Sequence, residues 1–202
     1  MPFITLIVWI LSLSYLQQNT TTILFFGDSL TAGYGLASTE HAFPALLEKE
    51  LNKGPKKVKV MNGGLSGETS AGGLGRIDWL LKQPIDIFVL ELGANDGLRG
   101  LPLSQTKSNL QAIITKVKTK YPKAKIVLAG MMVPPNLGKA YTDEFRKLYP
   151  ELAKQNKTEL IPFLLAGVAG DEKLNQGDGI HPNDQGHQII AKNLAVFFKK
   201  IL

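Results

Sequence analysis

The 202-residue sequence contains no cysteine. Disulfide frameworks, thiolate zinc sites, iron–sulfur clusters and cysteine nucleophiles are therefore excluded as explanations of its function. It also has only three histidines, which leaves little material for a metal site built on imidazole.

Long hydrophobic runs are absent except at the N-terminus, where residues 3–16 read FITLIVWILSLSYL. As a helix this run would span about 21 Å, which is short of the roughly 30 Å of a bilayer core. Its length is typical of the apolar region of a signal peptide. Ser12 and Ser14 offer a small-x-small cleavage pattern before Tyr15, and a site within residues 19–22 is an alternative.

No Lys or Arg precedes this apolar run, although signal peptides usually carry one. Three interpretations therefore stay open: an export signal, an uncleaved N-terminal membrane anchor, or a buried structural element. In each case we treat residues 1–20 as a separate segment and expect a single domain over residues 21–202.

A strong charge of one sign is also absent, since 23 Lys and Arg face 17 Asp and Glu for a net charge of +6. This is too weak to indicate nucleic-acid binding. The stretch between Asp96 and Asp143 nevertheless has no acidic residue and eight basic ones. It is either a solvated lysine-rich helix face or a surface that makes weak contact with anionic lipid headgroups.

Strand and helix patterns alternate along residues 21–202. Continuous apolar runs separated by helices predict an α/β domain with a parallel sheet covered on both faces. In such sheets the functional groups lie at the carboxyl ends of the strands. The predicted strands are 23–26, 57–61, 85–92, 126–132 and 159–163, and the predicted helices are 42–51, 68–82, 104–120, 141–156 and 183–200.

Polar or glycine-rich motifs follow the first three strands. Ser29, in the GDSL sequence at 27–30, suits a nucleophile whose N–H also stabilises an oxyanion, or a helix cap. The glycines of segment 62–70 let backbone N–H groups approach an anion, or form an ordinary flexible turn. Asn95, within 91–97, is either an oxyanion donor or a turn residue.

The last motif is DGIHPN at residues 178–183. The i, i+3 spacing lets the Asp178 carboxylate reach His181 Nδ1, which would leave Nε2 free to act as a base. His41 and His187 have no such partner spacing, so we predict surface or packing roles for them.

Taken together, a serine, a glycine N–H, an asparagine amide and an Asp–His pair at one sheet edge are a full set for acyl transfer. On these four blocks, in this order, the sequence resembles the SGNH or GDSL hydrolase family, and within it the bacterial thioesterase I/lysophospholipase (arylesterase) branch. The resemblance implies a three-layer α/β/α sandwich on a mostly parallel five-stranded, flavodoxin-like sheet. It also implies a triad of Ser29, Asp178 and His181, an oxyanion hole of Ser29, Gly67 and Asn95, and no metal or cofactor.

The function implied by the resemblance is hydrolysis of carboxylic esters or thioesters, including lysophospholipids, through an acyl-enzyme. Segment 130–140 matches the family only loosely, so the preferred acyl length stays open. One alternative is a carbohydrate acetylesterase, and another is a non-catalytic lipid-binding protein. We expect a monomer that is periplasmic or secreted, either free or held at a membrane by its N-terminal segment.

Overall fold

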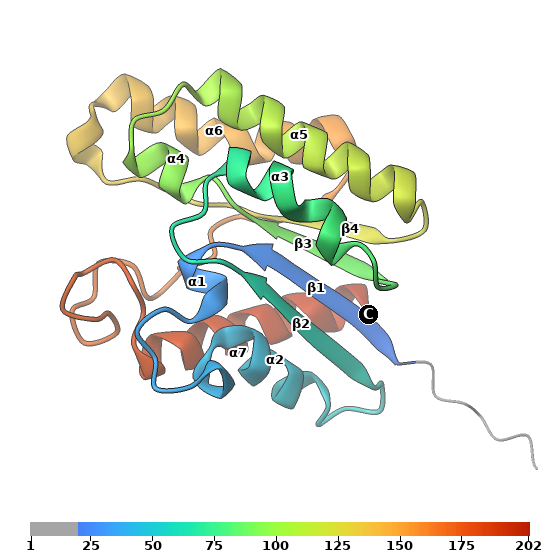
Figure 1. Ribbon diagram of the computed structural model, residues 1–202. Helices are drawn as coiled ribbons and strands as arrows, with labels where there is room; N and C mark the ends of the chain where they lie inside the picture. The colour runs from blue at the N-terminus through green and yellow to red at the C-terminus, as the bar shows by residue number, and fades with distance from the viewer. Residues whose placement is uncertain (1–19) are drawn as a thin grey trace, which may run out of the picture.

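The computed structural model describes residues 20–202, which form one five-stranded sheet with the strand order β2-β1-β3-β4-β5 (Figure 1). All four strand pairings are parallel, as the sequence predicts. The apolar run at 3–16 lies outside the described residues. The strands are β1 Thr21–Gly27, β2 Val58–Gly64, β3 Ile87–Glu91, β4 Lys125–Ala129 and β5 Glu159–Ile161.

Helices cover both faces of the sheet, which gives the three-layer α/β/α sandwich (Figure 1). Helices α3, α5 and α6 lie on one face, and α2 packs beside α7 on the other. Among residues 20–202, no helix is both long enough and apolar enough to cross a membrane. The helices are α1 Ser29–Ala32, η1 Thr39–His41, α2 Phe43–Leu51, α3 Ser70–Leu80, α4 Ala94–Leu98, α5 Leu103–Lys120, η2 Pro135–Leu137, α6 Lys139–Asn156 and α7 Asp184–Ile201.

The core lies along the two central strands. Every residue of β3 is buried, and so is β1 from Ile23 to Gly27. Such strands are apolar at nearly every position because both of their faces are covered. The outer strand β2 alternates instead, with Lys59 exposed between Val58 and Val60. The central position of β1 and β3 in the sheet therefore explains the continuous apolar runs that predict these two strands.

Three of the predicted strands extend too far, and the last of them, β5, ends at Ile161 rather than at residue 163. Strand β3 begins at Ile87, and β4 ends at Ala129. The chain leaves the sheet at Gly130, whose N–H still donates to the Ile161 carbonyl oxygen at 2.8 Å. Residues 130–132 are thus apolar without being strand, and they form a wall of the site described below.

The sequence also misses α1 and α4 and begins α3 two residues early. Both missed helices are too short, at four and five residues, to show a helical period. Helix α3 begins at Ser70 because the Thr69 side chain caps it by accepting from the Gly72 N–H. These three helix errors all fall just beyond the carboxyl ends of β1, β2 and β3, where the site lies.

Candidate active site

The order of strand addition reverses at β1, because β2 lies on one side of β1 whereas β3, β4 and β5 follow on the other. Ligands bind at such a switch point, outside the carboxyl ends of the strands. Ser29 begins α1, with only Asp28 between it and the end of β1, and Asn95 lies in α4, just after β3. The topology therefore brings two predicted site residues to one crevice.

The turn after β1 presents Ser29 at the start of α1. The preceding residue, Asp28, caps that helix, since its Oδ1 accepts from the Leu30 N–H at 3.0 Å. Within residues 20–202, no acceptor is bonded to the Ser29 N–H. The helix cap that the sequence analysis considers for Ser29 is thus provided by the neighbouring residue, Asp28.

Ser29, His181 and Asp178 form one hydrogen-bonded row. His181 Nε2 lies 2.9 Å from Ser29 Oγ, and His181 Nδ1 lies 2.6 Å from Asp178 Oδ2. Asp178 Oδ1 accepts from the backbone N–H of His181, which is the main cause that lowers the pKa of Asp178 to about 2. The Asp178 carboxylate is therefore ionised at neutral pH. The Tyr34 ring packs on the His181 imidazole, with 4.7 Å between the two ring centroids.

Gly67 follows β2 with a positive φ of 76°, a conformation that favours glycine. No described residue accepts from its N–H, while its carbonyl oxygen accepts from Arg99 Nη2 at 2.9 Å. The Gly67 N–H is thus available to a ligand.

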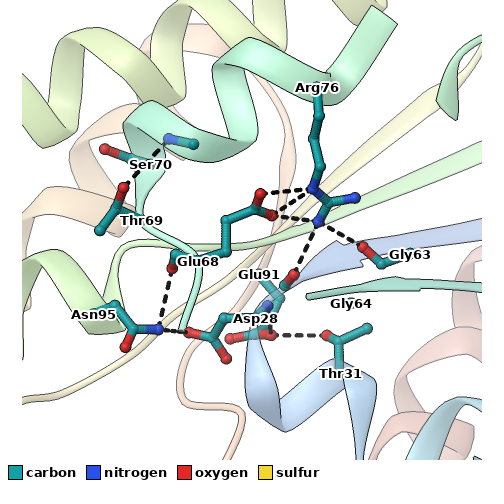
Figure 2. A network of polar contacts seen from close by, with 12 residues as sticks. Asp28, Thr31, Gly63, Gly64, Glu68, Thr69, Ser70, Arg76, Glu91 and Asn95 are labelled. Atoms are coloured by element: carbon teal, nitrogen blue, oxygen red, sulfur yellow. Dashed lines mark hydrogen bonds and ion pairs between the residues drawn. The ribbon is translucent and has the colours of Figure 1, made fainter. Parts of the chain in front are cut away.

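Asn95 is more constrained than the sequence suggests. Its Nδ2 donates to Asp28 Oδ2 at 3.0 Å and to the Glu68 carbonyl oxygen at 3.1 Å (Figure 2). An amide nitrogen has two hydrogens, so both are occupied in this structure.

A cavity of about 480 Å³ opens beside Ser29 and His181. Its volume falls within the range of small-molecule sites, and its lining is mostly apolar. Segment 130–140, whose role the sequence left open, supplies one wall of it. The apolar lining residues are Leu30, Ala94, Leu98, Met131, Met132, Val133, Pro134, Pro135, Phe163, Leu165, Ala169 and Ile180.

A buried carboxyl pair below the serine turn was not anticipated. Glu91 is fully buried, and its Oε2 accepts from the Asp28 N–H at 3.1 Å and from Thr31 Oγ1 at 2.7 Å. Burial raises the pKa of Glu91 well above its ordinary value and raises the pKa of Asp28 to about 6. The sequence signal for this pair is an acidic residue inside the apolar run of β3.

The Arg76 side chain joins the strand ends from above (Figure 2). Its guanidinium forms an ion pair with Glu68 and donates to the Gly63 carbonyl oxygen at 2.8 Å. It also lies 4.4 Å from the centroid of the Phe26 ring. Arg76 therefore fixes the loop that carries Gly67 and the Glu68 carbonyl.

The other two histidines lie away from this row. His41 is exposed and its Nδ1 lies 2.6 Å from Asp184 Oδ1. His187 is buried, and its Nδ1 accepts from the Phe43 N–H at 3.1 Å; burial lowers the pKa of His187 to about 4. Within the described part of the chain, no group of three or more His, Asp or Glu could hold a metal ion.

Half of the eight basic residues of the lysine-rich stretch lie on α5, and some of their charge is neutralised by ion pairs. Lys107 pairs with Glu151 and Lys116 with Asp78, each at 2.6 Å. Carboxylates from other elements thus approach this face, as expected of a solvated helix surface. The eight basic residues are Arg99, Lys107, Lys116, Lys118, Lys120, Lys123, Lys125 and Lys139.

Known proteins are similar to this chain in sequence and in fold. The model of the GDSL-like lipase/acylhydrolase family matches residues 25–189. Esterase TesA of Pseudomonas aeruginosa is 39% identical over 187 residues, 92% of each chain. The thioesterase 1/protease 1/lysophospholipase L1 of Escherichia coli K12 is 39% identical over 96% of this chain and 89% of the relative. A crystal structure of TesA superposes with a TM-score of 0.84 at 39% identity, covering 90% of this chain and 100% of that one.

Proposed function

The chain belongs to the GDSL-like lipase/acylhydrolase family and is a carboxylic ester hydrolase, and from that premise we propose that Ser29, His181 and Asp178 cleave acyl esters and thioesters through an acyl-enzyme. The observation that carries the proposal is the unbroken row from Ser29 Oγ through the imidazole to the Asp178 carboxylate. A nucleophile, a base and a group that orients the base need this geometry.

In this mechanism His181 Nε2 takes the proton of Ser29 Oγ as that oxygen attacks the acyl carbonyl carbon. Asp178 holds Nδ1–H and stabilises the imidazolium. The N–H groups of Ser29 and Gly67 and the amide of Asn95 donate to the oxyanion. The imidazolium then protonates the leaving group, and a water molecule repeats the sequence on the acyl-enzyme to release the acid.

We propose that the acyl chain lies in the apolar cavity beside Ser29, where its burial supplies binding energy. An acetyl group would leave most of a 480 Å³ cavity unused, so this site favours longer acyl groups over the carbohydrate acetylesterase alternative. We propose that the leaving group is an alcohol, a thiol or, in a lysophospholipid, the glycerol oxygen of its phosphate-bearing headgroup. The ion pairs on α5 give little support to contact with an anionic membrane.

For residues 1–20 we propose an export signal or N-terminal anchor, and hence a periplasmic or secreted enzyme. From its single domain we also propose that it is a monomer. The support is the length and composition of the apolar run. The mass of the protein recovered from a periplasmic fraction would separate cleavage at Tyr15, cleavage within 19–22, and retention of the whole segment. Recovery only from the cytoplasm would contradict export.

The function is tested by hydrolysis of p-nitrophenyl esters with acyl chains of two to sixteen carbons. We expect the parent to prefer chains longer than acetyl and Ser29→Ala to be inactive. Ser38→Ala, which removes the exposed cap of η1, is a matched serine control. If the parent turns over no ester above background, the catalytic proposal fails and a lipid-binding function replaces it. An optimum at two carbons would favour the acetylesterase.

A further inference from the structure

The amide of Asn95 is engaged before any substrate arrives. Both Nδ2 hydrogens have acceptors, Asp28 Oδ2 and the Glu68 carbonyl oxygen (Figure 2). Asn95 can therefore donate to an oxyanion only when one of these acceptors gives way. Which acceptor is retained decides how the amide is aimed.

The two acceptors differ in strength. The oxygen of Glu68 belongs to a neutral peptide group, whereas that of Asp28 belongs to a carboxyl group that is ionised above about pH 6. Hydrogen bonds to an ionised acceptor are roughly twice as strong as those between neutral groups. An oxyanion would thus displace the Glu68 carbonyl more easily than the Asp28 carboxylate.

Asp28 is itself fixed from two sides. Its Oδ1 accepts from the Leu30 N–H, and its own N–H donates to Glu91 Oε2. Glu91 fits there because residue 27 is glycine: a Cβ at this position would come within 2.2 Å of Glu91 Oε2. Asp28 and Glu91 are both buried, so the Asp28 carboxylate has a set position relative to Ser29.

We propose that Asp28 is a positioning residue: it retains one Nδ2 hydrogen of Asn95 and so aims the other at the oxyanion formed on the acyl group. The inference rests on the proposed function, in which Asn95 is an oxyanion donor. The Glu68 carbonyl is then the resting acceptor that the oxyanion replaces. Because this interaction improves only in the transition state, it contributes to kcat and little to KM.

Two substitutions of Asp28 test the proposal. Asp28→Asn supplies only one acceptor oxygen, so either the Leu30 N–H or Asn95 loses its partner. Asp28→Ser keeps a helix cap but is too short to reach Asn95 as well. We expect each variant to lower kcat by about 10²-fold with KM little changed, since misplacing a catalytic group costs about this much.

A double-mutant cycle separates positioning from a structural role. We expect Asn95→Ala alone to lower kcat by about 10²–10³-fold, as for the loss of one oxyanion donor. If Asp28 acts through Asn95, the double variant Asp28→Asn/Asn95→Ala is no slower than Asn95→Ala. Thr31→Val is the matched control, because it removes a bond to Glu91 in the same turn without touching Asn95. Its effect on kcat should multiply with that of Asn95→Ala.

Parent-like kcat in a folded Asp28→Asn or Asp28→Ser protein would overturn the inference and leave the triad intact. Losses that multiply in the Asp28→Asn/Asn95→Ala protein would do the same. Parent-like kcat in Asn95→Ala would instead remove the proposed oxyanion role of Asn95, and the inference with it. Thermal unfolding of every variant identifies any that lose activity by losing the fold.

Discussion

The proposed nucleophile, Ser29, and its proposed base, His181, lie in regions that are held in place differently. Ser29 stands on a turn between β1 and α1, and the carboxyl groups that hold this turn are buried. His181 and Asp178 stand on the irregular segment 162–183, where their side chains are 18% and 39% exposed. The core thus sets the position of the serine, whereas local hydrogen bonds at the surface set that of the base.

Segment 162–183 buries Leu164, Leu165 and Val168 in the core, and hydrogen bonds among its own backbone and amide groups hold the part around His181. The Gln176 N–H donates to the His181 carbonyl oxygen at 2.7 Å, and the Asn183 N–H donates to the Leu174 carbonyl oxygen at 2.9 Å. Besides the contact between His181 Nε2 and Ser29 Oγ, a bond from Gln176 Nε2 to the Tyr34 carbonyl oxygen at 2.7 Å reaches across to the other region. The two regions can therefore be disturbed separately, which the following predictions use.

The largest effect should be common to both regions. We expect Ser29→Ala and His181→Ala each to lower kcat by about 10⁴–10⁶-fold, because the two groups act as a unit. The double variant should be no slower than either single one, as steady-state kinetics on one ester would measure. A double variant slower than both would mean that the two residues act independently.

The Asp178 and Asp28 carboxylates should differ in how much their loss lowers kcat. Asp178→Asn leaves the histidine without the acceptor that fixes its tautomer, and we expect kcat to fall by about 10⁴-fold. That loss exceeds the one expected for Asp28→Asn, which acts through Asn95 alone. Comparing kcat of the two variants checks this order. Equal losses would mean that Asp28 also acts on the base.

Stability should respond most strongly in the buried region. Glu91→Ala removes a fully buried side chain and leaves the Asp28 N–H without a partner, so we expect the free energy of unfolding to fall by about 4 kcal/mol. Glu91→Gln should cost less than Glu91→Ala, because burial raises the pKa of Glu91 well above its ordinary value and the two side chains have similar shape. Denaturant unfolding at pH 7 measures both. A loss in Glu91→Gln as large as in Glu91→Ala would show that the charge matters.

The free energy of unfolding should fall in acid because of His187, which lies in α7. Folding lowers the pKa of His187 from 6.5 to about 4, mainly by burial. Between these values the unfolded chain binds a proton that the folded chain does not, so stability falls as the pH falls from about 6.5 to 4. The full effect is roughly 3 kcal/mol.

His187→Asn keeps an acceptor for the Phe43 N–H without a titrating group, so it is the control for this effect. The difference in unfolding free energy between parent and variant should shrink or reverse across that range. A constant difference would mean that His187 does not titrate there. Comparing the two proteins also removes the opposite contribution of Asp28, whose raised pKa favours the fold as the pH falls.

The sequence predicts elements well where a pattern is long. Helix α5 shows its apolar stripe over 18 residues, and β1 and β3 are apolar because both faces of the sheet are covered. Helices α1 and α4 carry or adjoin the site motifs but are shorter than the window that reveals a period. The ends of β3 and β4 depend on where hydrogen bonds to neighbouring strands stop, which hydropathy does not report.

The sequence alone determined the order of the four motifs and the local Asp178–His181 pair, because spacing along the chain decides both. The tertiary structure decided which groups surround them. Pairing of β1 with β3 sets Gly27 opposite Glu91, and so places a carboxyl group beneath a serine turn 63 residues away from it. It likewise brings Asp28 to Asn95. Such contacts depend on the register between strands, which no local pattern encodes.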